Sequence, residues 1–171
     1  MRASSRILAL GLAIFAAACG APDTSDGGGD AGPRRDGGSH GLPACAPADG
    51  GGTPGSFTHL YATYFDPAGP LTKCAQSGCH DSSASPSANL GLAPQDAAYT
   101  HLVNVAAMQA PATKLVNPND PANSYLVQKL SDATNPASPA NATQMPLSGC
   151  VLSSDQIAEF TAWIGAGAPN N

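Results

Sequence analysis

The stretch Cys74-Ala-Gln-Ser-Gly-Cys79-His80 is the most informative part of this chain, because it places two thiols directly before an imidazole. Each thiol can add across one vinyl group of a porphyrin, and the following histidine can bind the iron from the same side. The common attachment motif has two residues between its cysteines, whereas this stretch has four. Covalent haem binding through Cys74, Cys79 and His80 is therefore a hypothesis that the remaining sequence has to support.

The N-terminal residues predict export from the cytoplasm. Two arginines precede an apolar run over residues 7–18, which is too short to span a membrane. The small residues before Cys19 resemble a bacterial lipoprotein signal, in which residues 1–18 are removed and Cys19 receives the lipid. The alternative is an ordinary secretory signal with an incidental cysteine. Either signal predicts a location in the cell envelope, and Gly20 favours a lipid anchor in the outer membrane, on its periplasmic or surface face.

Composition divides the mature chain into a tether and a domain. Residues 19–55 are rich in Gly, Pro, Asp and Ser and have few large apolar side chains, so we expect a flexible tether. Residues 56–171 are then one small domain. Removing Arg2 and Arg6 leaves five basic residues (7 minus 2) against 12 acidic ones, a net charge of −7. This balance argues against nucleic acid as a partner.

Apolar periodicity within the domain predicts helices and no strands, hence an all-α fold with long loops. Large apolar residues are scarce, and an embedded apolar cofactor would supply the missing core. One long loop, from Asp132 to Gly149, carries Met145, whose sulfur is placed to act as a second axial iron ligand. The expected helices run from the Ser56 cap to Phe65, from Pro94 to about Val105, from Asp120-Pro121 to Leu130, and from the capping box Ser153-x-x-Gln156 to Ile164.

Taken together, the domain resembles single-haem c-type cytochrome domains, related to class I cytochrome c, that occur in exported bacterial proteins. The resemblance covers roughly Phe57 to Ala168. It rests on Cys74 to His80, on LVNPNDPANSYLVQKL at 115–130, on Met145-Pro146 and on LSSDQIAEFTAWIGAGA at 152–168.

The resemblance implies a small class I cytochrome c-like helical fold, in which residues 57–65 pack across residues 154–164. It also implies one haem c bonded to Cys74 and Cys79. His80 would then be the proximal iron ligand and Met145 the distal one.

Each of these assignments has an alternative. Cys74 and Cys79 could bond each other in an oxidising compartment and leave His80 solvated. Zinc is disfavoured, because the sequence has no second cysteine or histidine pair. Met145 could be a core or loop residue. The competing distal ligands are Met108, His59 and, as the strongest, His101. Trp163 is expected in the core, where it could also pack on the porphyrin edge. Lys114 and Lys129 are expected to be solvated.

The five cysteines support the haem hypothesis by elimination. With Cys19 lipidated and Cys74 and Cys79 bonded to haem, Cys45 and Cys150 remain, and we expect them to form a disulfide beside Met145. Without haem, the other four cysteines allow three pairings.

The expected function is one-electron transfer by a membrane-tethered carrier that is not itself an enzyme. No nucleophile motif, phosphate loop or paired carboxylates are recognisable in the sequence. The partners would be redox proteins, and the acidic charge favours a basic docking face on them. One alternative is a haem-free, disulfide-stabilised surface lipoprotein or binding module. Another is a haem sensor or a subunit of a redox complex.

Overall fold

A computed structural model of the chain describes residues 42–131 and 144–171. The predicted signal peptide, the predicted lipidation site Cys19 and most of the expected tether lie outside these ranges, as do residues 132–143. Within the two described ranges, no helix has both the length and the apolar character needed to cross a membrane.

The first helix begins where the sequence predicts. The side chain of Ser56 accepts a hydrogen bond from the backbone N–H of His59 at 3.1 Å and caps α1 (Phe57–Leu60). The chain continues without a break into η1 (Tyr61–Phe65), a π-helical turn in which the N–H of Asp66 donates to the carbonyl of Tyr61. Because this hydrogen bond joins residues five apart rather than four, the turn is wider than a turn of an α-helix. Single π-helical turns of this kind are frequent at functional sites.

The last helix also has the predicted start. In α4 (Ser154–Gly165), the hydroxyl of Ser153 accepts from the N–H of Gln156 at 3.3 Å. The side-chain oxygen of Gln156 accepts in return from the N–H of Ser153 at 2.9 Å, which completes the capping box.

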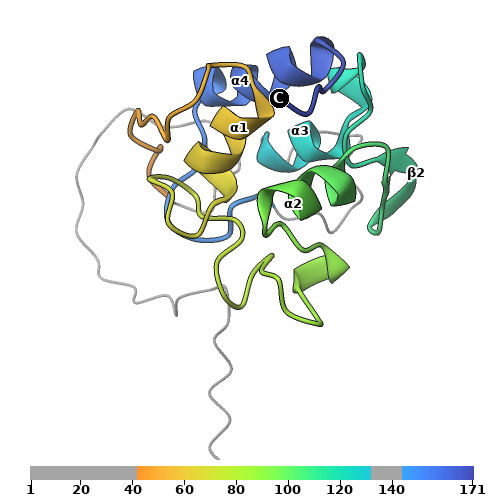
Figure 1. The fold of residues 1–171 in the computed structure, drawn as a ribbon, viewed down its shortest axis with the longest axis horizontal. Helices are drawn as coiled ribbons and strands as arrows, with labels where there is room; N and C mark the ends of the chain where they lie inside the picture. The colour runs from red at the N-terminus through yellow and green to blue at the C-terminus, as the bar shows by residue number, and fades with distance from the viewer. Residues whose placement is uncertain (1–41, 132–143) are drawn as a thin grey trace, which may run out of the picture.

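These two helical segments form the centre of the core. Phe57 stacks on Trp163 with ring centroids 5.2 Å apart, and Tyr64 contacts Phe160 at 4.9 Å. All four side chains are at most 1% exposed. Figure 1 shows α1 beside α4, with the C-terminus close to both. The expected packing of residues 57–65 against the C-terminal helix is therefore present.

Shorter elements surround this pair. The helices are α2 (Gln95–Leu102), which begins after Pro94, and α3 (Tyr125–Leu130), while η2 (Ser87–Asn89) and η3 (Pro121–Asn123) are 3-10 turns. Asp120 caps η3 by accepting from the N–H of Asn123 at 3.2 Å.

The prediction of an all-α, class I cytochrome c-like fold is wrong. A two-stranded antiparallel sheet joins β1 (Ala106–Ala107) to β2 (Ala110–Lys114), and Ala106 pairs with Lys114. The helix expected to reach Val105 ends at Leu102, because Val103 is extended and Asn104 has a φ of 61°. The described chain is thus a mixed α/β fold with a few short helices.

The hairpin escaped prediction because its sequence carries no strand pattern. β1 has two residues, and β2 is Ala-Pro-Ala-Thr-Lys without a buried residue. Period-two alternation needs large apolar side chains on one face, and none is present here.

The predicted disulfide between Cys45 and Cys150 is present, with Cα atoms 4.8 Å apart. Beside it, the N–H of Cys45 donates to the carbonyl of Val151 at 2.8 Å. Further along, the N–H of Gly50 donates to the hydroxyl of Thr63 at 3.0 Å. The end of the segment expected to be a tether therefore lies against the domain.

Candidate functional site

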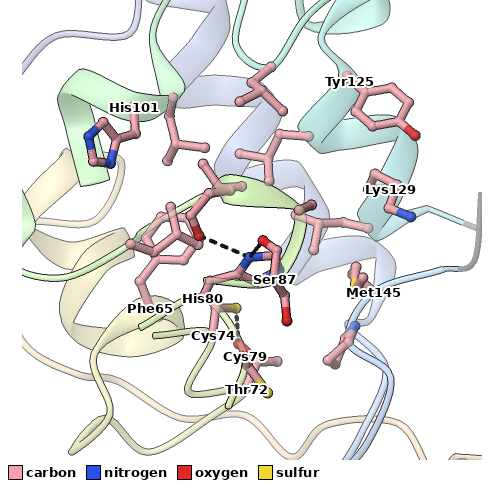
Figure 2. A pocket seen from close by; sticks show the side chains of 18 of the residues that line it. Phe65, Thr72, Cys74, Cys79, His80, Ser87, His101, Tyr125, Lys129 and Met145 are labelled. Carbon is pink, nitrogen blue, oxygen red and sulfur yellow. Dashed lines mark hydrogen bonds between the residues drawn. The ribbon is translucent and has the colours of Figure 1, made fainter. Parts of the chain in front are cut away.

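A cavity of about 620 Å³ lies between the cysteine loop, α2, the hairpin, α3 and the segment after residue 144 (Figure 2). This volume is within the usual range for cofactor and small-molecule sites. Apolar side chains from most of these elements form its walls. Among its lining residues are six that the sequence had singled out: Cys74, Cys79, His80, His101, Met108 and Met145.

The π-helical turn η1 positions the cysteine loop. Its last two residues, Tyr64 and Phe65, present carbonyls that accept from the N–H groups of Cys74 at 3.1 Å and Ala75 at 2.8 Å. The loop then closes on itself, since the N–H of His80 donates to the carbonyl of Cys74 at 3.1 Å. Backbone hydrogen bonds therefore hold the first cysteine and the histidine close together.

The thiol of Cys74 is a hydrogen-bond donor. The hydroxyl of Thr72 donates to the carbonyl of Tyr64 at 2.7 Å, and its oxygen lies 3.4 Å from the sulfur of Cys74. A hydroxyl has one proton, and the carbonyl can only accept it, so the S–H group of Cys74 points at the Thr72 oxygen. Burial raises the pKa of the Cys74 thiol, which keeps it protonated at neutral pH.

The second cysteine differs in its bonding state. Cys79 is disulfide-bonded, and its sulfur also accepts a hydrogen bond from the side-chain amide of Gln76 at 3.6 Å. Cys74 has a free thiol, so the alternative in which these two cysteines bond each other is not present.

The ring of His80 is held in one tautomer. Its Nδ1 lies 3.0 Å from the carbonyl oxygen of Ser87 and 3.1 Å from that of Leu90. Both carbonyls can only accept, so Nδ1 carries the proton and Nε2 keeps its lone pair. Burial lowers the pKa of His80, the charge of Lys129 lowers it further, and the two carbonyls partly oppose this shift. A neutral imidazole with a free lone pair is what a metal ligand requires.

Met145 is the most buried of the three distal candidates that line the cavity. Its side chain is half-buried, and its backbone N–H donates to the carbonyl of Lys129 at 2.7 Å. Met108 lies on the turn of the hairpin and is 60% exposed. His101 is exposed, and its Nδ1 donates to the carbonyl of Gly91 at 2.7 Å. Figure 2 shows Met145 and His101 on opposite sides of the view, with His80 between them.

Two other residues considered in the sequence analysis, the distal-ligand candidate His59 and the core residue Trp163, do not line this cavity. His59 is buried, and its two ring nitrogens contact the carbonyl of Gly51 at 2.9 Å and the carboxylate of Glu159 at 3.1 Å. Trp163 is 1% exposed and donates its indole N–H to the carbonyl of Pro169 at 2.9 Å. Trp163 is thus a core residue.

Sequence reasoning missed Lys129. It was expected to be solvated, but it is 9% exposed and lines the cavity, and burial lowers its pKa. Its position four residues after Tyr125 could have revealed this, because residues at that spacing share one face of a helix. The carbonyls of Ser87 and Leu90 gave no such signal, since backbone contacts leave no mark on residue type.

Comparison of the chain with protein-family models, with curated protein sequences and with solved structures found no match in any of the three.

Proposed function

We propose that this protein is a monohaem c-type electron carrier of the cell envelope, tethered through a lipid on Cys19. One observation carries the proposal: separate chain segments bring two cysteine sulfurs, an imidazole and a thioether to the same cavity. That set of groups is the one that covalent haem attachment with histidine and methionine ligation requires.

The chemistry of the cavity is compatible with a porphyrin. Its walls are largely apolar, as a flat apolar ring requires, and they include Phe65, Leu92, Leu102, Leu115 and Leu130. A haem in this cavity would supply a one-electron redox centre.

The residues of the chain would determine how such a centre behaves. The carbonyls of Ser87 and Leu90 hold the His80 ring in place. The ring would therefore need to move little when the charge of a bound redox centre changes. The thioether of Met145 would favour a higher reduction potential than a second histidine would. The apolar walls would exclude water from both ligands.

Attachment requires both cysteines as thiols. In each addition the sulfur bonds to one vinyl carbon and the thiol proton goes to the other, with no net oxidation or reduction. The thiol of Cys74 meets this requirement. The disulfide at Cys79 has to be reduced first by an external dithiol, which is itself oxidised to a disulfide in the exchange.

The test is expression of the mature chain in a periplasm that contains c-type maturation machinery. We expect an intact mass greater than that of the lipidated polypeptide by one haem, and a pigment that survives denaturation and acid-acetone extraction. Replacing Cys74 and Cys79 by serine should abolish the pigment. Replacing Cys45 and Cys150 by serine also removes a cysteine pair and serves as the matched control, because it should leave haem covalently attached. A mass equal to that of the lipidated polypeptide alone contradicts the proposal.

A haem-free binding module is the second candidate, and the largely apolar cavity of about 620 Å³ favours it. In that case the apolar cavity would take a different small molecule. The same expression experiment separates the two, since the module would be colourless.

A further inference from the structure

The charged residues that line the cavity are all cations. Among the described residues these are Lys73 and Lys129, and no Asp or Glu is present in the lining. The whole chain has 12 acidic and 7 basic residues, so the lining departs from the composition of the protein. Such a lining fits a ligand that is apolar in its body and carries anionic groups at its edge.

The two lysines lie in different parts of the cavity. Lys73 is exposed and precedes Cys74 directly in the chain, so it belongs to the end where the thiols are. Lys129 is 9% exposed and lies on α3 beside Tyr125. Figure 2 shows Tyr125 and Lys129 on one side of the cavity, away from Cys74 and Cys79.

The neighbours of Lys129 are suited to an anion. Tyr125 lines the same cavity, and its hydroxyl donates to the side-chain oxygen of Gln109 at 3.0 Å, which leaves the phenol oxygen able to accept. An anionic group beside Lys129 would offset the desolvation of its ammonium group.

The shape of a porphyrin then distinguishes between the lysines. Its two vinyl groups and its two propionates lie on opposite halves of the ring. If the vinyl half reaches Cys74 and Cys79, the carboxylates must lie at the other end, where Lys129 is.

We propose that Lys129 binds the propionate carboxylates of the porphyrin and thereby orients the ring in the cavity. This inference rests on the proposed function. Lys129 would act as a positioning residue: an ammonium on a rigid helix would pair with a carboxylate and fix which edge of the ring faces the thiols.

The test uses the full mature chain with Cys74→Ala and Cys79→Ala, so that porphyrin binding is reversible. The probes are zinc protoporphyrin IX and its dimethyl ester, which lacks the negative charges, and binding is followed by porphyrin fluorescence. Lys129→Met should weaken binding of the free acid by roughly tenfold and leave binding of the ester unchanged. Lys129→Arg should restore most of the loss. Lys114→Met is the matched control and should change neither affinity, because this exposed lysine does not line the cavity.

Several results would overturn the inference. Equal loss for acid and ester would mean that Lys129 only packs, and a larger effect of Lys73→Met would place the carboxylates at the thiol end. Unchanged affinity of Lys129→Met for the free acid, with an unchanged circular dichroism spectrum, would remove Lys129 from the site. Failure of the proposed function is distinct, because the wild-type chain would then carry no covalent haem after maturation.

Discussion

The ring nitrogen Nδ1 of His80 lies 3.1 Å from the carbonyl oxygen of Leu90. Two residues further on, the N–H of Leu92 donates to the carbonyl of His80 at 2.7 Å. The segment after the cysteine loop thus holds both the backbone and the ring of the histidine. The contact of Nδ1 with the Leu90 carbonyl sets the tautomer of the ring before any ligand binds, and the backbone bond holds the residue in place.

The first prediction concerns the pH dependence of the haem-free protein. Burial lowers the pKa of His80 in the folded state, so the unfolded chain takes up this proton at a higher pH than the folded chain does. The stability that depends on a neutral His80 is present above the ordinary histidine pKa of about 6.5 and is lost as pH falls through the folded pKa.

We expect the free energy of unfolding of the wild type, relative to His80→Gln, to fall between about pH 7 and about pH 5. Urea unfolding at several pH values measures it, and His101→Gln controls for the removal of an exposed histidine. A difference between wild type and His80→Gln that stays constant over this range would contradict the expectation.

The second prediction concerns the distal ligand. Met145→Ala should lower the reduction potential of the haem-loaded protein by on the order of 0.1 V, because axial ligands set potentials over a range of about 0.8 V. It should also remove the sulfur-to-iron band from the ferric spectrum. Met108→Ala is the control, since this exposed methionine lines the same cavity. If Met108→Ala rather than Met145→Ala removes the band, the ligand is on the hairpin.

The third prediction concerns the disulfide between Cys45 and Cys150, which closes a loop with a sequence separation of 105 residues. Replacing both cysteines by serine should lower the free energy of unfolding by about 2–5 kcal/mol, chiefly because the unfolded chain has more conformational entropy without the cross-link. Denaturant unfolding without reductant measures the loss. The same experiment on Cys74→Ser should show a much smaller change, because that thiol is free. Equal stability of the double serine variant and the wild type would contradict the prediction.

Local signals account for the parts of the fold that could be predicted. The Ser153 capping box and the Ser56 cap each depend on residues within one helical turn, so they are visible in the sequence. The pairing of Cys45 with Cys150 followed from counting cysteines. Residue type and spacing predicted Cys74, Cys79 and His80 as the haem-binding residues.

Tertiary contacts decide the parts that could not be predicted. The hairpin from Ala106 to Lys114 has no apolar alternation, and its pairing depends on the packing around it. The burial of Lys129 follows from the way α3 faces the cavity. The tautomer of His80 depends on two carbonyls that lie seven and ten residues further along the chain. The hairpin and the tautomer have no signature in residue type, and only the four-residue spacing from Tyr125 indicates the burial of Lys129.

The last prediction concerns Thr72, whose hydroxyl donates to the carbonyl of Tyr64 and accepts from the thiol of Cys74. Thr72→Val keeps the shape of the side chain but removes both hydrogen bonds. It should cost about 1 kcal/mol of stability, because the carbonyl of Tyr64 loses one of its two donors and keeps the N–H of Cys74. The Cys74 sulfur also loses the contact that orients it. We therefore expect a fraction of the matured protein to carry haem through Cys79 alone, detected as alkylatable Cys74 in peptide mass spectra. Thr161→Val is the matched control, since its hydroxyl donates to the carbonyl of Ile157 within α4, away from the cavity lining. Full thioether formation at Cys74 in Thr72→Val would show that the loop backbone, held by the carbonyls of η1, is sufficient to position this sulfur.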